Sequence, residues 1–289
     1  MITIDRGRLD TVAKEYLSRL RDFGIVHKRS EVGKIVKELS DDELENLILC
    51  PPELLKKKKV SGKVSANRFL RAYYRYFAVK GNDGVNNAIW LLMRLSIKVC
   101  PYCNRTYTFT VKKKPKKAKR QVRPELDHFF PKSKYAHLAL SFYNLVPSCP
   151  QCNHLKGDNE FDYHPYYGDL NGKVVPRIEV ENVQRDAKGF LVFPDAPKVK
   201  ILDGNENTKV LGLQELYEQH EDYVKEILDK IQAYNKDYYN SLVDSFQGMG
   251  KTQEEIDRLV WGNYIEDAKQ EKRPLSKMTR DLLRQFGVI

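Results

Sequence analysis

Two Cys-x-x-Cys pairs constrain the fold of this chain more than any other feature of its sequence. The four residues are Cys100, Cys103, Cys149 and Cys152. Four thiolates in two such pairs are the ligands of a closed tetrahedral zinc site, which holds a fold together without taking part in chemistry. Between the pairs lies Asp127-His128, a carboxylate beside an imidazole, which can serve a hydrolytic centre with a second metal ion. The pattern predicts a structural zinc site next to a catalytic site.

Composition favours a globular protein in a reducing compartment. Hydrophobic residues make up 41% of the 289 residues and charged residues 31%. A run of about eighteen apolar residues, as a membrane span needs, is not found. The first residues lack the apolar region of a secretory signal. Four of the five cysteines lie in the Cys-x-x-Cys pairs, which fits metal binding better than disulfides. We therefore expect a cytoplasmic protein that does not enter a membrane.

The positive charge of the chain is concentrated in its central part. Residues 51–150 carry 22 Lys and Arg but 4 Asp and Glu, a net charge of +18, against +11 for the whole chain. Clustered Lys and Arg side chains bind a polyanion by releasing counterions from its phosphates. Residues 201–250, with 4 basic and 10 acidic residues, favour a protein interface over DNA reading. The central part is therefore expected to bind DNA through its phosphate backbone.

The hydrophobic pattern predicts an α+β protein that is predominantly helical. Residues 1–95 follow a helical period, and Ser40 to Glu43 form a capping box. Residues 106–111 alternate as a strand does. Short strands follow residue 166, then a long helix over about 213–234, a helix with a capping box at Thr252 and a last helix after Pro274. We expect a helical region at 1–95, a central module at 96–166, and strands then helices at 167–289.

Several motifs of the central segment occur in a distinctive order. They are CPYC, an expected strand, a basic run, ELDHFFPKS and NLVPSCPQCNHLKGD. In this order, over about Val99 to Asp158, the chain resembles the HNH endonucleases, the ββα-metal or His-Me finger superfamily, in their zinc-knuckle form. The resemblance implies a ββα-metal module with a four-cysteine zinc site. It also implies an enzyme that hydrolyses phosphodiester bonds with the help of a divalent cation.

The resemblance assigns roles to the residues of the motif. His128 corresponds to the general base that takes a proton from the attacking water. Asp127 corresponds to a ligand of the catalytic cation, Mg²⁺ or Mn²⁺. Asn144 is implied to orient His128, either directly or by holding the intervening loop. Asn153 stands where the family name has histidine; an amide oxygen can bind a hard cation. The neighbouring His154 is the alternative second ligand.

Further lysines of the segment are expected to contact substrate. Lys156 matches a position of the motif where a lysine contacts a substrate phosphate. The basic run is read as a hairpin tip or loop that binds phosphates through Lys112, Lys113, Lys114, Lys116, Lys117, Lys119 and Arg120. The resemblance also implies that the four cysteines bind zinc without chemistry and brace a module too small to bury much area.

A weaker resemblance extends beyond the module. LGLQELYEQHEDYVKEIL and RPLSKMTRDLLRQFG follow it in a layout similar to the HNH subunits of Septu-type antiphage systems, which are encoded beside ABC-type ATPases. This implies an effector nuclease with an ATPase partner and terminal helices that serve as docking surfaces. Two alternatives remain open. One is a stand-alone restriction or homing-type HNH nuclease; the other is a non-catalytic zinc module that binds nucleic acid.

Overall fold

The computed structural model describes residues 1–289 apart from 60–61, 63, 113–121, 170–175, 194–195 and 235. Most of the basic run therefore lies outside the described residues, namely Lys113, Lys114, Lys116, Lys117, Lys119 and Arg120. Lys112 is described and is exposed to solvent. The role expected for this run remains a prediction.

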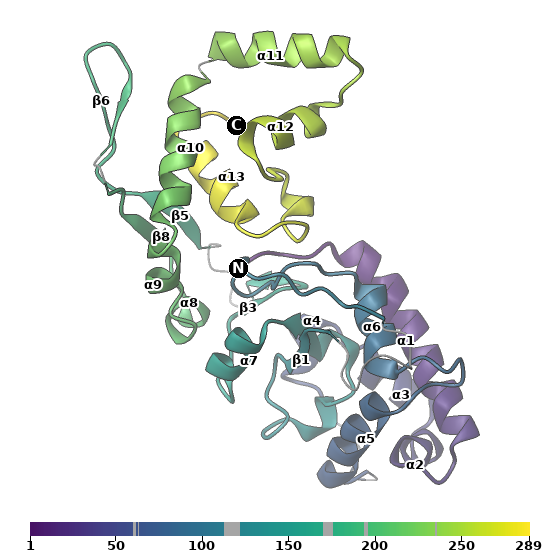
Figure 1. The fold of residues 1–289 in the computed structure, drawn as a ribbon. Coiled ribbons are helices and arrows are strands. Elements are labelled where there is room, and N and C mark those ends of the chain that lie inside the picture. Colours follow the sequence, from purple (N-terminus) through teal and green to yellow (C-terminus); the bar gives the residue numbers. More distant parts are fainter. Residues whose placement is uncertain (60–61, 63, 113–121, 170–175, 194–195, 235) are drawn as a thin grey trace.

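The N-terminal region consists of helices, as predicted (Figure 1). They are α1 (Arg6–Val26), α2 (Glu31–Glu38), α3 (Asp41–Ile48), α4 (Pro52–Leu55), α5 (Ala66–Ala78) and α6 (Asn87–Leu95). Helix α3 begins with the capping box expected from its sequence, in which Ser40 and Glu43 bond to each other's backbone N–H groups. The apolar stripe of α1 is buried, and Tyr16 at its centre packs on Tyr76 and Phe77 of α5.

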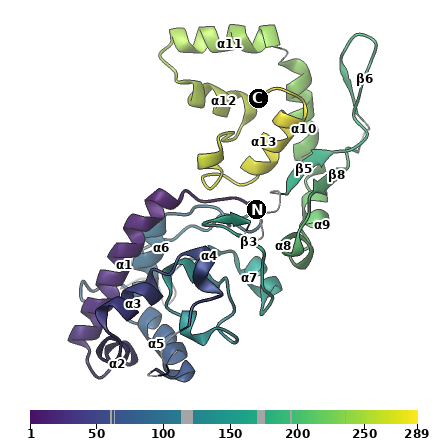
Figure 2. The same ribbon diagram turned by 180° about the vertical axis from the view of Figure 1, so that it is seen from behind.

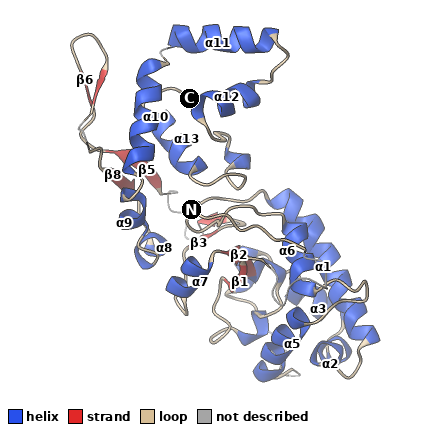
Figure 3. Cartoon of the chain, in the orientation of Figure 1, coloured by secondary structure: helices blue, strands red, loops and turns tan. Residues whose placement is uncertain are grey.

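The central module is a two-stranded antiparallel sheet followed by a short helix. Strand β1 (Glu125–His128) pairs with β2 (Leu145–Ser148), and α7 (Pro150–Lys156) follows at once. The register sets Asp127 opposite Val146 and His128 opposite Leu145. The turns η1 (Ala136–Leu138) and η2 (Phe142–Asn144) lie in the connection between the strands. The predicted α+β class with a central ββα module is confirmed (Figure 3).

The strand expected at residues 106–111 is not a regular strand. The segment forms two isolated antiparallel bridges, Val99 with Tyr107 and Val111 with Val122. It is nevertheless anchored, because Thr108 is buried and donates its backbone N–H to Lys98 O at 2.8 Å. The alternating pattern therefore identified an extended ribbon whose pairing is too sparse to make a strand.

The C-terminal region combines small sheets with helices. Its strands are β3 (Tyr163–His164), β4 (Gly168–Asp169), β5 (Arg177–Val180), β6 (Gln184–Arg185), β7 (Leu191–Val192) and β8 (Val199–Leu202). They pair as β3–β4, β5–β8 and β6–β7, and β6–β7 forms a projecting arm. The helices are α8 (Glu206–Val210), α9 (Leu213–Glu218), α10 (Glu221–Ala233), α11 (Lys236–Gly248), α12 (Gln253–Trp261), η3 (Asp267–Lys269) and α13 (Ser276–Gln285).

The single long helix expected over about 213–234 is broken into α9 and α10. The break lies at His220, whose φ of −103° and ψ of 33° leave the helical region. His220 Nε2 accepts a hydrogen bond of 2.8 Å from Arg105 Nε in the central module. This contact joins residues 115 positions apart, and the helical periodicity of the local sequence carries no sign of it.

The first Cys-x-x-Cys turn joins the module to the rest of the chain. The chain start lies beside it, between the lower and upper parts of the molecule (Figures 1 and 2), and Ile2 N donates to Pro101 O. Asn104 is fully buried in a left-handed conformation, with φ of 51°. Its carbonyl accepts from Leu275 N at 2.7 Å and its Oδ1 from Lys277 N at 2.9 Å. The C-terminal helix α13 thus starts on this turn.

One connected core of buried apolar residues runs through the molecule, from Met1 to Leu283. Within the part of the chain that the structure describes, none of the helices combines the length and apolar character of a membrane span.

Candidate metal centre and active site

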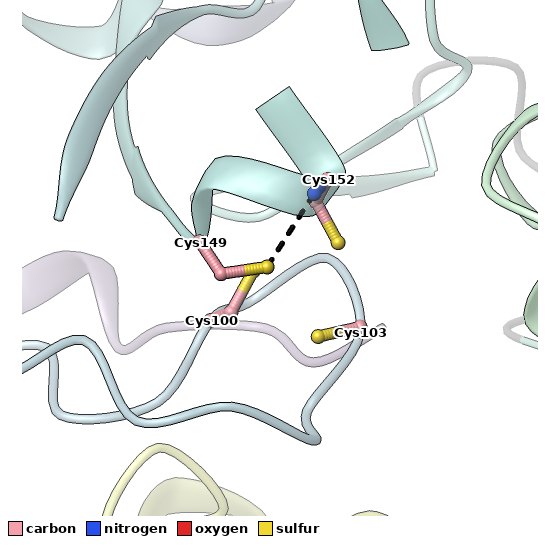
Figure 4. A group of neighbouring side chains, drawn as sticks. All are labelled: Cys100, Cys103, Cys149 and Cys152. Atoms are coloured by element: carbon pink, nitrogen blue, oxygen red, sulfur yellow. Dashed lines mark hydrogen bonds between the residues drawn. The ribbon is translucent and has the colours of Figure 1, made fainter. Parts of the chain in front are cut away.

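The four cysteines of the two pairs form one buried cluster. Their Sγ atoms all lie within 4.8 Å of one another. Figure 4 shows Cys149 and Cys152 at the start of α7 and Cys100 and Cys103 on the opposing turn, with the sulfurs converging. Zn–S bonds of about 2.3 Å in a tetrahedron place sulfurs roughly 3.8 Å apart, so a zinc ion fits this cluster.

Backbone N–H groups point at two of these sulfurs. Cys149 caps α7, and its Sγ accepts from Cys152 N at 3.4 Å; Cys103 Sγ accepts from Arg105 N at the same distance. Hydrogen bonds from the neighbouring thiols, that of Cys100 first, lower the pKa of Cys103 and Cys149, whereas burial raises the pKa of Cys100 and the Cys100 thiol raises that of Cys152. Such donors stabilise the thiolate, the form that binds a metal. The arrangement therefore suits a structural ion.

Asp127 is buried beneath α7 with partners for both carboxylate oxygens. Tyr102 Oη donates to its Oδ2 at 2.6 Å, and Lys156 Nζ lies 3.4 Å from Oδ1 and 3.3 Å from Oδ2. Burial raises the pKa of this carboxyl, while Lys156 and then Tyr102 act in the opposite direction. Asp127 is 5% exposed. The structure thus holds the expected cation ligand against a lysine and a tyrosine.

His128 is buried on the other side of β1. Its Nε2 lies 3.1 Å from Ala139 O, and its ring packs edge-on against Tyr73 at 4.4 Å between centroids. Because a carbonyl only accepts, Nε2 carries the hydrogen, and Nδ1 is left with the lone pair. Burial above all, followed by the charge of Lys132, lowers the pKa of His128 to about 3. The imidazole is therefore neutral, the form that a general base requires.

Asn144 holds the connection between the two strands. Its Oδ1 accepts from Phe130 N at 2.7 Å, and its Nδ2 donates to Phe130 O at 3.1 Å and Leu138 O at 3.2 Å. Of the two functions that the sequence left open for Asn144, these contacts match the loop-holding one. The loop that it closes carries Ala139, whose carbonyl binds His128.

Asn153 and His154 differ in their orientation. Asn153 is half-buried, and its Nδ2 donates to the Glu125 carboxylate on β1. His154 is exposed to solvent on the first turns of α7. Asn153 therefore faces the strand that carries Asp127, whereas His154 does not contact it in any bond that the structure shows among the described residues. Mg²⁺ needs few protein ligands, because waters and substrate phosphates supply the others.

Lys156 lies in an unexpected place for a residue that contacts substrate. Its side chain is fully buried, and Nζ donates to His128 O at 2.7 Å besides pairing with Asp127. These contacts fix the β1 backbone at the point where the acid and the imidazole diverge. The lysine is thus placed to position both residues.

Three residues of the site were missed by the sequence analysis. Tyr102 bonds to Asp127 from inside the first Cys-x-x-Cys pair, and Glu125 precedes Asp127 by two residues, so the alternation of a strand puts both on one face. Lys132 is half-buried; after burial, its charge is the next cause of the low pKa of His128, and it weakly opposes the burial that raises the pKa of Asp127. The position of Glu125 was readable from ELDH, whereas the approach of Tyr102 depends on tertiary packing.

A cavity lies apart from Asp127 and His128. It measures about 920 Å³, lies between residues 1–6 and helix α13, and has Tyr163, Lys277 and Arg280 in its wall. Neither Asp127 nor His128 lines it.

Comparison with known proteins agrees with the motif. The family described as HNH endonuclease matches residues 100–159. The Septu protein PtuB of Bacillus thuringiensis is 30% identical over 92 residues, which cover 32% of this chain and 31% of that protein. The match thus spans about a third of the length of this curated relative. No solved structure matches the chain. Residues 100–159 match the HNH endonuclease family, and the chain is similar to a Septu protein over about a third of its length.

Proposed function

We propose that this protein is a metal-dependent HNH endonuclease that hydrolyses phosphodiester bonds of DNA in the cytoplasm. The observation that supports it most is the state of His128. Its Nε2–H is committed to Ala139 O, which leaves the lone pair on Nδ1. An imidazole held in one tautomer by a backbone carbonyl is prepared to accept a proton from water. Residues 96–166 would carry this activity.

The chain's own residues would divide the remaining tasks. Asp127 and Asn153 would hold a Mg²⁺ or Mn²⁺ ion, which supplies Lewis-acid stabilisation of the leaving oxygen. Lys156 would hold β1 in place, and Asn144 would hold the loop that orients His128. A phosphate near His128 raises the pKa of the imidazole, because negative charge favours its protonated form. The proposed products carry a 5′ phosphate and a 3′ hydroxyl.

The four-cysteine cluster would bind Zn²⁺ and take no part in chemistry. Its four ligand positions are filled by sulfur, which leaves none for water or substrate. Its task would be to clamp the first turn of the module to the start of α7.

We further propose that the chain is the effector nuclease of a bacterial antiphage system and acts with an ABC-type ATPase. The similarity to a Septu protein supports this, as does the acidic character of residues 201–250. Large apolar side chains are also exposed there and on the next helix, including Met249 at 66% and Leu259 at 59%. Residues 167–289 would then form a docking surface. Co-purification of the tagged chain from its host, followed by mass spectrometry, tests for such an ATPase.

The rival proposal is a zinc module that binds nucleic acid without cutting it. The burial of both Asp127 and His128 favours this reading, because a catalytic pair has to meet its substrate. Nicking of supercoiled plasmid in Mg²⁺ or Mn²⁺ separates the two. We expect cleavage by the wild type and by His27→Ala, which changes a surface histidine, and none by His128→Ala with the same zinc content. Full activity in His128→Ala would remove the assigned base.

The choice of cation ligand has its own test. Asn153→Ala should raise the Mg²⁺ concentration needed for half-maximal cleavage, whereas His154→Ala should leave it unchanged. The reverse result would transfer the ligand role to His154.

A further inference from the structure

Two aromatic side chains stack on each other at the surface of the extended ribbon. Tyr107 and Phe109 have ring centroids 4.4 Å apart and planes inclined by 19°. The residues are 46% and 49% exposed. An exposed stacked pair leaves the outer ring face without an aromatic neighbour from the pair, so a further flat group can extend the stack.

The ribbon holds this pair in a defined position. Cys100 N donates to Thr106 O at 2.9 Å, and Val99 bridges to Tyr107. Thr108, between the two aromatic residues, is buried and donates its hydroxyl to Ile97 O at 3.0 Å. Alternation along an extended chain then turns residues 107 and 109 outward together. Backbone pairing at Cys100 and Val99 therefore joins the segment that carries the two rings to the start of the first Cys-x-x-Cys turn.

The pair lies within a wider apolar surface. Val111 and Val122, which bridge to each other, are 46% and 50% exposed, and Met93 is 48% exposed. Phe109 and Met93 line the same hollow of about 230 Å³. Contiguous exposed apolar surface of this kind marks a place where another molecule binds.

The charge of the sequence near Tyr107 and Phe109 indicates what kind of molecule binds there. Residues 84–124 contain 11 Lys and Arg and no Asp or Glu. Of the cations that the structure describes, Lys98, Lys112 and Arg123 are exposed on or beside the ribbon. A ribbon that presents aromatic rings beside exposed cations fits the bases and the phosphates of a nucleic acid.

We propose that Tyr107 and Phe109 form a stacking platform for unpaired nucleotides of the substrate. Bases within a duplex already stack on their neighbours, whereas those of a single strand or a frayed end are free to stack on a protein ring. This inference rests on the proposed function, and it adds the substrate class: single-stranded or locally opened nucleic acid. Ring stacking engages the base and not the sugar, so single-stranded RNA is included in the test beside single-stranded DNA.

The test compares ring stacking with plain apolarity. Anisotropy of labelled oligonucleotides gives the affinity of the full-length chain for single-stranded DNA, single-stranded RNA and duplex DNA, without added divalent cations. Replacing both rings by leucine keeps apolar bulk but removes stacking. We expect Tyr107→Leu with Phe109→Leu to lose affinity for single strands about tenfold or more, with a much smaller loss for the duplex. Tyr107→Phe, which keeps the ring, should bind as the wild type does.

Three results would contradict the proposal. Unchanged single-strand affinity in the leucine variant, or an equal loss for duplex and single strand, would overturn the platform. So would absence of nucleic-acid binding by the wild type. Because binding is measured without cleavage, the two proposals fail separately: ring-dependent binding by a chain that never cuts would sink the nuclease assignment alone. Zinc content and melting temperature of each variant confirm that the fold is intact.

Discussion

Lys156 and Asp127 form an ion pair inside the protein, with Nζ 3.3 Å from Oδ2 and side-chain exposures of 0% and 6%. The same ammonium donates to His128 O. Removing one partner of a buried pair leaves an uncompensated charge, whereas replacing both is tolerated far better. Loss of either partner of this ion pair should therefore destabilise the module.

Lys156→Met should lower the free energy of unfolding by about 3–5 kcal/mol, because the buried carboxylate of Asp127 is left without the ammonium group of Lys156. Adding Asp127→Asn should restore a substantial part of that loss, since the amide needs no counter-charge. Urea denaturation of the single and double variants measures this, with the exposed Lys134→Met as control. A double variant no more stable than Lys156→Met would contradict the pairing.

Asn144→Leu should impair cleavage and stability together. The variant leaves Phe130 N and Phe130 O without the amide that bonds them, at about 1–3 kcal/mol for each buried group left unsatisfied, whereas Leu138 O keeps its bond from Ser141 N. The loop that carries Ala139 would shift, and His128 would lose its fixed tautomer. Plasmid nicking and thermal melting check the result. Asn159→Leu, at a nearby exposed amide, should have little effect on either.

Cys149→Ser should release the bound metal and loosen the C-terminal helix. Its sulfur belongs to the four-cysteine cluster, and the turn held by that cluster receives Leu275 and Lys277 through Asn104. Zinc content should fall from about one ion per chain toward zero. Limited proteolysis should then cut near α13 sooner than in the wild type. Cys50→Ala, outside the cluster, should keep its metal, and metal loss there would contradict the assignment.

Stability should fall on acidification because of His164. Its Nε2 donates to Tyr143 O, its Nδ1 accepts from Tyr166 N, and burial lowers its pKa to about 3. In the unfolded chain His164 becomes protonated below about pH 6.5, whereas in the folded chain it stays neutral down to about pH 3. The contribution of His164 to the free energy of unfolding is therefore complete above about pH 6.5 and is lost as the pH falls toward about 3. His164→Gln should reduce the slope of unfolding free energy against pH by about 1.4 kcal/mol per unit between these limits. Equal slopes in variant and wild type would refute this.

Local signals predicted local structure well. The capping boxes at Ser40 and Thr252 are both present, because each needs residues only three positions apart. The spacing of the cysteines predicted their convergence, since two Cys-x-x-Cys turns are a compact way to gather four sulfurs. The order of motifs indicated the family that residues 100–159 match.

What the sequence could not supply depends on distant contacts. The break at His220 arises beside Arg105, and the burial of Lys156 follows from the packing of α7 on β1. The substrate role expected for Lys156 came from its position in the motif, and full burial of a lysine is rare. Asn104 gave no signal at all, although its position directly after the first Cys-x-x-Cys pair decides where α13 begins.

The pleat of β1 has a consequence for how this module tolerates changes in chain length. Asp127 and His128 reach opposite sides because adjacent residues alternate, and the ladder with Leu145 to Ser148 fixes which side each one takes. A slip of one position would exchange them, sending the ring toward Lys156 and the carboxylate toward Ala139. An offset of a single residue in the four-rung ladder is therefore not tolerable, and an insertion between Phe130 and Asn144 has to leave the bonds of Asn144 and Ala139 in place.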